Sequence, residues 1–370
     1  MNKNRENISQ PSFAPAAMAT GIGSLPFTDL NQAMELIKKY LPEIPHWPQL
    51  PRRGKIEHFV HQYLQPLISC GMLMPIGDSW RFDTSDESCA ACMTDFYTLC
   101  LPAEDNDPDC MQSFLPPSEA APGFHAFISE IQKGTFENAV YIKGQIAGPL
   151  SLSLELKDQN GRPAYYQDDL RDMLVRTLAL NARSQAATMA ATNLTPIIFV
   201  DDPAVKAFGS RLHLALNRET IIEDLNTIFT AIQQEGAITG VHSCEAVDWS
   251  LLLETKVEIL SLDAYRFGDS LKAYAKPLRR FIENGGVVAW GIVPTLDDPF
   301  AESVDSLEQR LETLWDTLFE AGPDRSVVLK QSMITPACGA GLLTEAQAEQ
   351  IYQLTANLAN RLSNNPKLKT

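Results

Sequence analysis

The sequence predicts an α/β protein built as a parallel (β/α)8 barrel of the TIM type, and three observations favour this fold. From Phe124 onward, apolar runs of strand length alternate with amphipathic segments of helix length. Counting along the chain gives about eight such strands, which suits the closure of a parallel barrel. The turn Gly21-Ile22-Gly23 is followed by Pro26 where a dinucleotide-binding fingerprint needs its third glycine, which disfavours an open doubly wound sheet.

The composition excludes several classes of partner. A net charge of -16 argues against nucleic acid and against an anionic membrane surface, because both bind basic faces. No apolar segment approaches the roughly 20 residues that span a bilayer. The seven cysteines are odd in number and unevenly spread, which favours reduced thiols and metal ligation over a disulfide framework. Residues 1–17 lack the apolar core of a signal peptide, so a cytoplasmic protein is expected.

The predicted domain organisation is a flexible tail over residues 1–16 and one barrel domain over residues 17–370. An insertion at about residues 72–122, between the second and third strands, begins with a hairpin and continues as an acidic, proline-rich stretch. Cys89-Ala90-Ala91-Cys92 lies in this stretch, but no strand precedes it as a thioredoxin-type pair would require. We therefore expect Cys89, Cys92, Cys100 and Cys110 to be unrelated, partly buried thiols.

The remaining elements follow from periodicity and from proline and glycine breaks. Residues 44–51 are rich in proline and are expected to be extended. The predicted strands are residues 17–22, 140–146, 196–200, 237–241, 257–262, 287–290 and 326–330. The predicted helices are residues 29–40, 55–69, 167–191, 218–235, 248–254, 270–283, 303–320 and 343–362.

Unusual polar residues recur at the predicted carboxyl ends of these strands. His242 and Cys244 are two residues apart, so an extended chain points both side chains to the same face. Cys338, in a glycine-framed loop, follows a later strand. One imidazole nitrogen and two thiolates suit zinc, and three ligands leave one position open for chemistry. In a barrel the strand ends open onto one face, so we expect the three residues to meet there.

Other residues at the strand ends leave alternatives open. Ser24 and Gln145 end two strands, and Asp201-Asp202-Pro203 ends another. The aspartate pair suits a binding site but also a helix-entry cap. Asp263 is a candidate fourth ligand, a partner of a ligand, or a loop cap. A single histidine or cysteine, taken alone, is more often a buried structural residue, and the metal hypothesis therefore depends on the three residues together.

Four motifs resemble the catalytic barrel of cobalamin-independent methionine synthases. Thr20-Gly21-Ile22-Gly23-Ser24 resembles the family's Ile-Gly-Ser strand end, and Val200-Asp201-Asp202-Pro203 resembles its Asp-Glu-Pro turn. His242-Ser243-Cys244 resembles its zinc-binding His-x-Cys, and Cys338-Gly339-Ala340-Gly341 its late zinc cysteine. The superfamily also contains uroporphyrinogen decarboxylase, which lacks this zinc site.

The resemblance implies specific roles for the matching residues. It implies zinc bound by His242, Cys244, Cys338 and Asp263, where Asp263 stands in place of the family's glutamate. It implies substrate binding by Ile22, Gly23, Ser24, Asp201 and Asp202, with Asp201 on the amino group of homocysteine. Asp201 and Asp263 are then the expected catalytic residues.

The expected activity is methyl transfer to a zinc-activated, homocysteine-like thiol. The donor implied by the resemblance is 5-methyltetrahydrofolate, but the long N-terminal half that helps the family hold folate is absent here. Methylcobalamin, free or on a corrinoid protein, is therefore a second candidate donor. The alternatives are a uroporphyrinogen decarboxylase-like enzyme, with Arg52, Arg53 and Arg266 as candidates for binding carboxylates, and a non-catalytic corrinoid- or thiol-binding protein.

Overall fold

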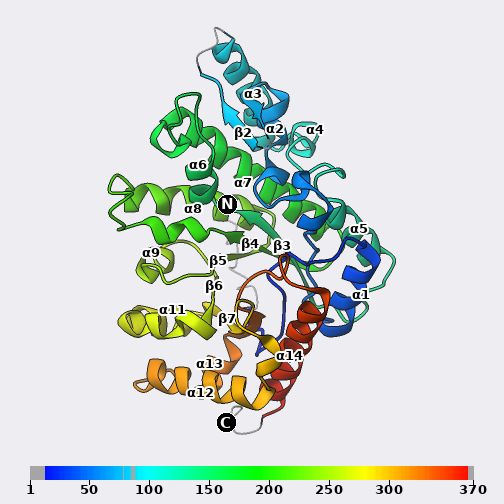
Figure 1. The fold of residues 1–370 in the computed structure, drawn as a ribbon, viewed down its shortest axis with the longest axis vertical. Coiled ribbons are helices and arrows are strands. Elements are labelled where there is room, and N and C mark those ends of the chain that lie inside the picture. The colour runs from blue at the N-terminus through cyan, green and yellow to red at the C-terminus, as the bar shows by residue number, and fades with distance from the viewer. Residues whose placement is uncertain (1–12, 78, 85–87, 366–370) are drawn as a thin grey trace, which may run out of the picture.

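The computed structural model describes residues 13–77, 79–84 and 88–365, and its centre is a curled parallel sheet of six strands (Figure 1). The strands pair in chain order, each parallel to the next. They are β3 (Tyr141–Ala147), β4 (Thr195–Asp201), β5 (Ile238–Ser243), β6 (Ile259–Leu262), β7 (Val287–Val293) and β8 (Ser332–Pro336). Parallel neighbours need crossover connections, and helices supply most of them.

Helices surround the outer face of the sheet, as Figure 1 shows for α7, α8, α11, α12 and α14. The helices outside the insertion are α1 (Leu30–Tyr40), α5 (Pro122–Gln132), α6 (Pro149–Glu155), α7 (Asp168–Ala190), α8 (Arg218–Gln234), α9 (Trp249–Leu253), α10 (Ala264–Phe267), α11 (Ala275–Glu283), α12 (Val304–Phe319), α13 (Arg325–Lys330) and α14 (Glu345–Asn364). No helix in the described ranges is both long and apolar enough to cross a membrane.

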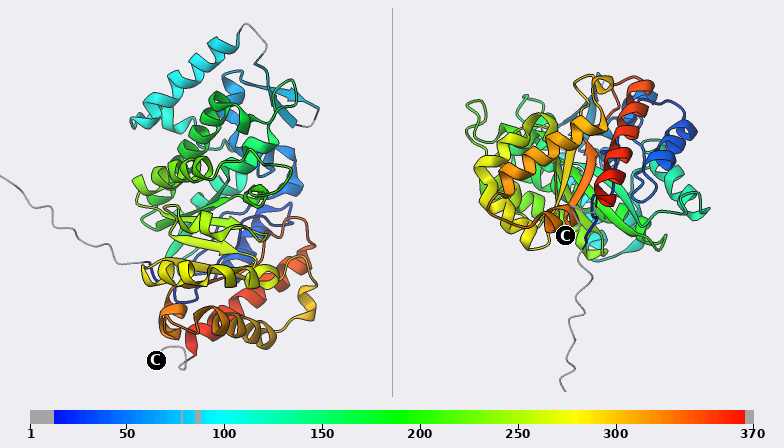
Figure 2. Two further views of the ribbon diagram at one scale, coloured as in Figure 1. Left: turned by 90° about the vertical axis from the view of Figure 1, so that its left-hand side faces the viewer. Right: turned by 90° about the horizontal axis from the view of Figure 1, so that it is seen from below.

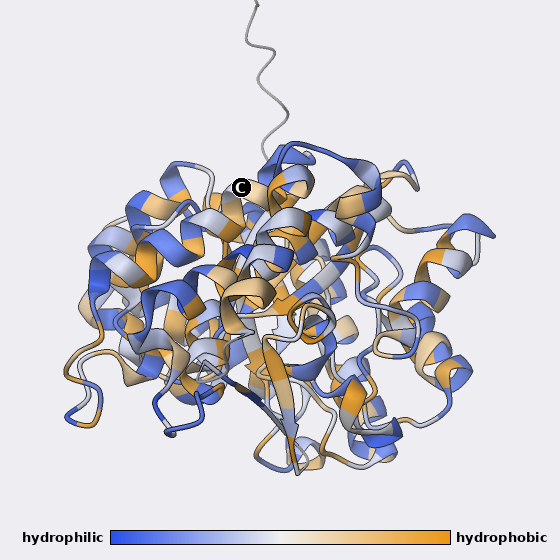
Figure 3. Ribbon diagram, turned by 90° about the horizontal axis from the view of Figure 1, so that it is seen from above, coloured by the Kyte–Doolittle hydropathy of each residue, from blue (hydrophilic) through white to orange (hydrophobic). Residues whose placement is uncertain are grey.

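The strands are apolar on both faces, because helices cover one face and the interior of the curled sheet encloses the other. Along β4, Ile198 and Val200 belong to the large cluster beneath the helices, whereas Ile197 and Phe199 belong to a second cluster. The second cluster fills the interior of the curled sheet toward the amino-terminal ends of the strands, here called the lower interior. It consists of Ile44, Ile197, Phe199, Ile259, Val287, Ala289 and Met333. In Figure 3 the strands near the centre are correspondingly coloured as hydrophobic.

Two extended segments lie between the edge strands β8 and β3. Residues 16–20 bond to β8: the main-chain nitrogens of Ala17 and Thr20 donate to the carbonyls of Ser332 and Ile334. On the other side, the nitrogens of residues 47 and 143 donate to the carbonyls of residues 143 and 45. The two segments meet at a parallel bridge between residues 24 and 49. Main-chain hydrogen bonds thus connect both edges of the six-stranded sheet.

The first predicted strand, residues 17–22, is not a regular strand. Residue 19 forms only an isolated bridge to β8. Ala16 and Ala17 have positive φ angles of 49° and 68°, and this backbone conformation interrupts an extended ladder. The sequence suggests about eight strands for the barrel, whereas the described residues form a parallel sheet of six, and residues 44–50 are extended as predicted.

Residues 326–330 were predicted to form the last strand, and this prediction is wrong. They form the short helix α13, and β8 begins two residues later at Ser332. A short apolar run such as Val327-Val328-Leu329 does not distinguish strand from buried helix by its pattern. Cys338 still follows the last strand, because β8 ends at Pro336.

The predicted insertion projects at one end of the molecule, opposite α12 and α13 (Figures 1 and 2). Its hairpin is confirmed, since β1 (Leu73–Ile76) pairs antiparallel with β2 (Ser79–Phe82). The helices α3 (Cys89–Glu104) and α4 (Pro108–Gln112) follow. The predicted helix over residues 55–69 is instead two 3-10 turns and the short helix α2 (Gln65–Ser69), whose second residue is a proline. The predicted tail over residues 1–16 falls mostly outside the described residues.

Candidate metal and thiol site

His242 is the second-to-last residue of β5, and its ring is buried at the carboxyl end of the sheet. Its Nδ1 lies 2.9 Å from the hydroxyl oxygen of Ser261, which stands opposite His242 in the register of β6. Its Nε2 is buried and has no hydrogen-bond partner among the described residues. A ring held through one nitrogen with the other nitrogen unpaired is the arrangement of a metal-binding histidine.

Cys244 follows β5 directly, and Cys338 lies two residues beyond β8. The ligand atoms of His242, Cys244 and Cys338 all lie within 4.8 Å of one another. Within the described ranges this is the only group of three or more histidine, cysteine or acidic residues with such spacing. The structure therefore brings Cys338 together with His242 and Cys244, which precede it by more than ninety positions in the chain, as the strand-end argument expects.

The two thiols interact strongly with each other. The neighbouring Cys338 thiol, with His242 as a smaller influence, lowers the pKa of Cys244 to about 4. The same contact raises the pKa of Cys338, because a second thiolate beside the first is disfavoured. The contact thus favours a single thiolate in the pair, and a bound cation would favour ionisation of both thiols.

Ser24 holds the loop that carries Cys338. The main-chain nitrogen of Ala340 donates to the carbonyl of Ser24 at 2.9 Å, and that of Gly341 donates to its hydroxyl at 3.3 Å. Gly339 approaches so closely that an added Cβ would lie 2.1 Å from the Ser24 hydroxyl oxygen. A side chain at 339 would therefore force the Ser24 hydroxyl or the loop to move, and Ser24 lies beside the loop that carries Cys338.

The two aspartates at the end of β4 differ in their environments. Asp202 is buried, and its oxygens accept from the main-chain nitrogens of Leu150 and Ser151 at 3.0 and 2.9 Å. It therefore bonds to the first turn of α6, as in the helix-cap alternative. Asp201 has a buried Oδ1 with no partner among the described residues. Burial raises the pKa of each aspartate to about 6.

Asp263 lies at the end of β6 and is 2% exposed. Its Oδ1 accepts from the main-chain nitrogen of Arg266 at 2.8 Å, which caps α10. Burial raises the pKa of Asp263 to about 6. Its oxygens do not belong to the group formed by His242 and the two cysteines, so its metal ligation stays a prediction.

Three polar residues of the site were not assigned a role from the sequence. Ser261 contacts the candidate ligand His242, while Lys143 and Gln145 lie on β3 with their side chains buried. The pairing of Ser261 with His242 depends on the register between two strands, which one sequence does not reveal. A lysine within the mainly apolar run Tyr141–Ala147, which also contains Gln145, was the available signal for Lys143.

The arginines considered for binding substrate carboxylates are bonded within the protein. Arg52 donates to the carbonyl of Leu343 at 2.7 Å, and Arg53 donates to Glu57 at 2.7 Å. Arg266 forms two bonds to Asp297, at 2.8 and 3.0 Å. None of the three guanidinium groups is therefore free of protein partners.

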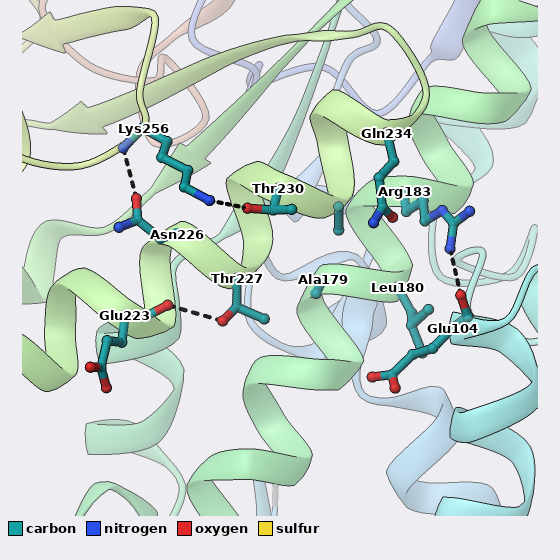
Figure 4. A pocket seen from close by; sticks show the side chains of 11 residues that line it. Glu104, Ala179, Leu180, Arg183, Glu223, Asn226, Thr227, Thr230, Gln234 and Lys256 are labelled. Carbon is teal, nitrogen blue, oxygen red and sulfur yellow. Dashed lines mark hydrogen bonds between the residues drawn. The ribbon is translucent and has the colours of Figure 1, made fainter. Parts of the chain in front are cut away.

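A surface pocket of about 570 Å³ lies away from this site, in the layer of helices (Figure 4). Side chains of α7, α8 and α3 line it together with Lys256. Its cations are already engaged: Arg183 pairs with Glu235 at 2.7 Å, and Lys256 donates to Thr230 at 3.1 Å. None of the predicted site residues lines this pocket.

Comparisons with known proteins give similar structures but no similar sequence. No protein-family model matches the chain. No curated protein matches it. One similar structure is a B12-independent methionine synthase from Shewanella sp. W3-18-1 in complex with selenomethionine, at 14% identity and a TM-score of 0.44. Another is a putative vitamin-B12-independent methionine synthase from Listeria monocytogenes, at 18% identity and a TM-score of 0.44.

The two matches are partial. Each covers 63% of this chain, and they cover 65% and 68% of the two neighbours. The chain thus matches less than two thirds of the length of the Shewanella structure.

Proposed function

We propose that this chain is a zinc-dependent methyltransferase that methylates a thiol, with homocysteine as the acceptor. The observation that supports this proposal is the convergence of His242, Cys244 and Cys338, with all ligand atoms within 4.8 Å. One nitrogen and two sulfur donors suit zinc, and three protein ligands leave a position open for a substrate. The proposal therefore depends on this donor set and on its open position.

The residues present fit a zinc ion. The Nε2 of His242 has no hydrogen-bond partner among the described residues, while Ser261 fixes the other ring nitrogen. Cys244 already favours its thiolate form, and both sulfurs lie beside the imidazole. When bound, the ion would lower the pKa of an acceptor thiol, ordinarily about 8.5, so that its sulfur is available as a thiolate at neutral pH.

The neighbouring residues would bind and orient the acceptor. We assign Asp201 to the acceptor's ammonium group, because its Oδ1 is unpaired among the described residues and it lies opposite His242 in the register of β4 and β5. We assign Ile22, Gly23 and Ser24 to the wall beside the acceptor. Asp202 would support Asp201 indirectly by holding α6.

We assign Asp263 a role beside the three converging residues His242, Cys244 and Cys338. Its carboxylate caps α10 and lies close enough to His242 and Cys244 to influence its charge. We propose that, when a zinc ion is bound, the carboxylate of Asp263 offsets part of its positive charge or contacts it directly. Metal ligation by Asp263 remains part of the proposal.

The proposal includes a closed barrel as the fold of the chain. We infer that the six strands and the two extended segments, residues 16–25 and 44–50, form one closed (β/α)8 barrel. The hydrogen bonds of residues 17 and 20 to β8 and of residue 47 to β3 support this inference. Residues 17–370 would then be one domain, with the insertion at about residues 72–122.

The methyl donor has to be found by experiment. The candidates are 5-methyltetrahydrofolate and methylcobalamin, and no feature of the described residues favours a corrinoid protein. A decarboxylase of the uroporphyrinogen type is not favoured, because Arg52, Arg53 and Arg266 bond within the protein. A non-catalytic thiol-binding protein would bind zinc and homocysteine but would not turn over with either donor.

The test combines metal analysis with turnover. Protein purified under reducing, zinc-replete conditions is analysed for bound zinc and then incubated with L-homocysteine and each donor. We expect stoichiometric zinc and methionine formation in the wild type, and neither in Cys338→Ser. A wild type without stoichiometric zinc would contradict the proposal, and zinc and thiol binding without turnover would identify the non-catalytic alternative.

A further inference from the structure

Lys143 is a lysine inside the curled sheet. It lies in the middle of β3, is 0% exposed, and shares its face of the strand with Gln145. Its Nζ lies 4.5 Å from the centroid of the Phe199 ring, which belongs to the lower interior cluster. Lys143 thus lies between the apolar lower interior and the polar residues at the strand ends.

A lysine at this position is unfavourable unless its nitrogen has a role. Removing an ammonium group from water costs several kcal/mol after relaxation. Burial correspondingly lowers the pKa of Lys143 to about 8. Among the described residues its hydrogen-bond and ring partners are a main-chain carbonyl, an amide oxygen and an aromatic ring. The charge of the Asp201 carboxylate partly offsets the effect of burial on the pKa of Lys143. An unbranched apolar residue would fill the same space without this cost.

The contacts of Lys143 converge on the first extended segment. Its Nζ donates to the carbonyl of Ile22 at 2.5 Å and to Oε1 of Gln145 at 3.2 Å. Gln145 in turn donates to the carbonyl of Trp47 at 3.1 Å and packs against Gly23, where an added Cβ would lie 2.8 Å from its Cδ. The side chains of Lys143 and Gln145 therefore hold residues 22–23, which do not form a regular strand.

The next residue of that segment is Ser24, which bonds the loop of Cys338. Its carbonyl and hydroxyl accept from the nitrogens of Ala340 and Gly341. A continuous set of contacts therefore runs from Lys143 through Ile22 and Ser24 to the loop that begins at Cys338. Cys244 lies outside this set, because it follows β5 directly.

We propose that Lys143, assisted by Gln145, is a positioning residue that sets the place of Cys338 in the metal site by holding the main chain of Ile22–Ser24. It acts through that segment and not on the ligands themselves. The inference goes beyond the proposed function, because it concerns the place of one thiol whether or not a metal is bound. Only its metal readout rests on the proposed function.

The test compares Lys143→Met with Gln145→Met and with Met333→Leu. Met333 is buried in the lower interior cluster, so its volume-conserving replacement perturbs the core without removing a hydrogen bond of Lys143 or Gln145. The first readout is the rate at which iodoacetamide modifies Cys338 relative to Cys244 in the metal-free full chain, followed by peptide mass spectrometry. We expect this ratio to rise severalfold in the Lys143 and Gln145 variants and to stay unchanged in Met333→Leu.

The second readout is binding of cobalt(II), whose absorption reports thiolate ligands. In Lys143→Met we expect affinity to fall about 10-fold or more, with weaker thiolate-to-cobalt charge-transfer absorption, as for residues that orient a ligand. Unchanged modification ratios in both β3 variants, or an equal rise in Met333→Leu, would overturn the inference. If Lys143→Met does not fold, Gln145→Met decides. If the wild type binds no cobalt, the proposed function fails, while the modification ratio still decides the inference.

Discussion

The candidate ligands come from two regions that are held in place differently. His242 lies within β5, where parallel partners on both sides fix the backbone, and Cys244 follows that strand directly. Cys338 belongs to a glycine-containing loop after β8, and Ser24, remote from it in the chain, holds that loop. The difference teaches that one ligand is fixed by the sheet and a second is the next residue but one, whereas the third depends on contacts that can be changed without breaking the sheet.

The largest expected effect is the loss of either thiolate. In Cys244→Ser or Cys338→Ser, zinc affinity should fall about 1,000-fold, because each of three ligands contributes several kcal/mol of binding free energy. Competition with a chromophoric chelator measures this change. Cys110→Ser is the matched control, since Cys110 is a free cysteine in α4 outside the candidate group. If either site variant still bound stoichiometric zinc, His242, Cys244 and Cys338 would not form one metal site.

A smaller effect is expected from displacing the loop alone. Gly339→Ala places a Cβ 2.1 Å from the Ser24 hydroxyl oxygen, so the loop must move, and metal affinity should fall about 10- to 100-fold. The double variant Ser24→Ala/Gly339→Ala removes the clash, since the next atom of Ser24 lies 3.4 Å away. Cobalt(II) titration should therefore show partial recovery in the double variant, and no recovery would show that Ser24 does not govern the loop.

The adjacent aspartates at the end of β4 sharpen the comparison between structural and functional roles. Asp202→Asn should lower the free energy of unfolding by about 2 kcal/mol, because an amide cannot accept all the bonds from α6. Its metal affinity should not change. Asp201→Asn should instead leave stability nearly unchanged and weaken homocysteine binding. Denaturant unfolding measures the change in stability, and calorimetry measures homocysteine binding. If Asp201→Asn lost stability and Asp202→Asn lost homocysteine binding, the two assigned roles would have to be exchanged.

The smallest expected effect is a pH dependence due to Lys143. Its pKa is about 8 in the folded protein and about 10.5 in the unfolded chain, so the unfolded state binds more protons between these values. Stability therefore rises with pH across this window and is lost as pH falls toward 8. Relative to Lys143→Met, the wild type should gain about 1 kcal/mol of unfolding free energy between pH 8 and 9. Equal pH profiles for the two proteins would indicate a solvated lysine.

The sequence predicted the regular part of the fold better than the part that connects its edges. From Tyr141 to Ser243, the strands and the long helices α7 and α8 were predicted within a few residues, because apolar runs and helical periodicity alternate clearly there, whereas the short helix α6 was not predicted. Residues 17–22 and 326–330 were assigned as strands on short apolar runs. The positive φ angles of Ala16 and Ala17, and the helix α13, depend on tertiary contacts that such runs do not encode.

The candidate site was likewise predicted only in part from the sequence. The meeting of His242, Cys244 and Cys338 followed from their places at strand ends, because parallel strands end on one face. Ser261 was missed because its contact with His242 depends on inter-strand register. Lys143 was missed although it interrupts a mainly apolar run, because its partner is a main-chain carbonyl whose position depends on tertiary structure.

The support of Cys338 by Ser24 has a consequence for biosynthesis. Residue 24 is translated long before the loop beginning at Cys338, and Cys244 is also translated before that loop. A nascent chain therefore exposes the Cys244 thiol before Cys338 is in place. Under the proposed function, zinc binding by the complete ligand set must follow synthesis of Cys338, and until then the Cys244 thiol depends for protection on the reducing power of its surroundings.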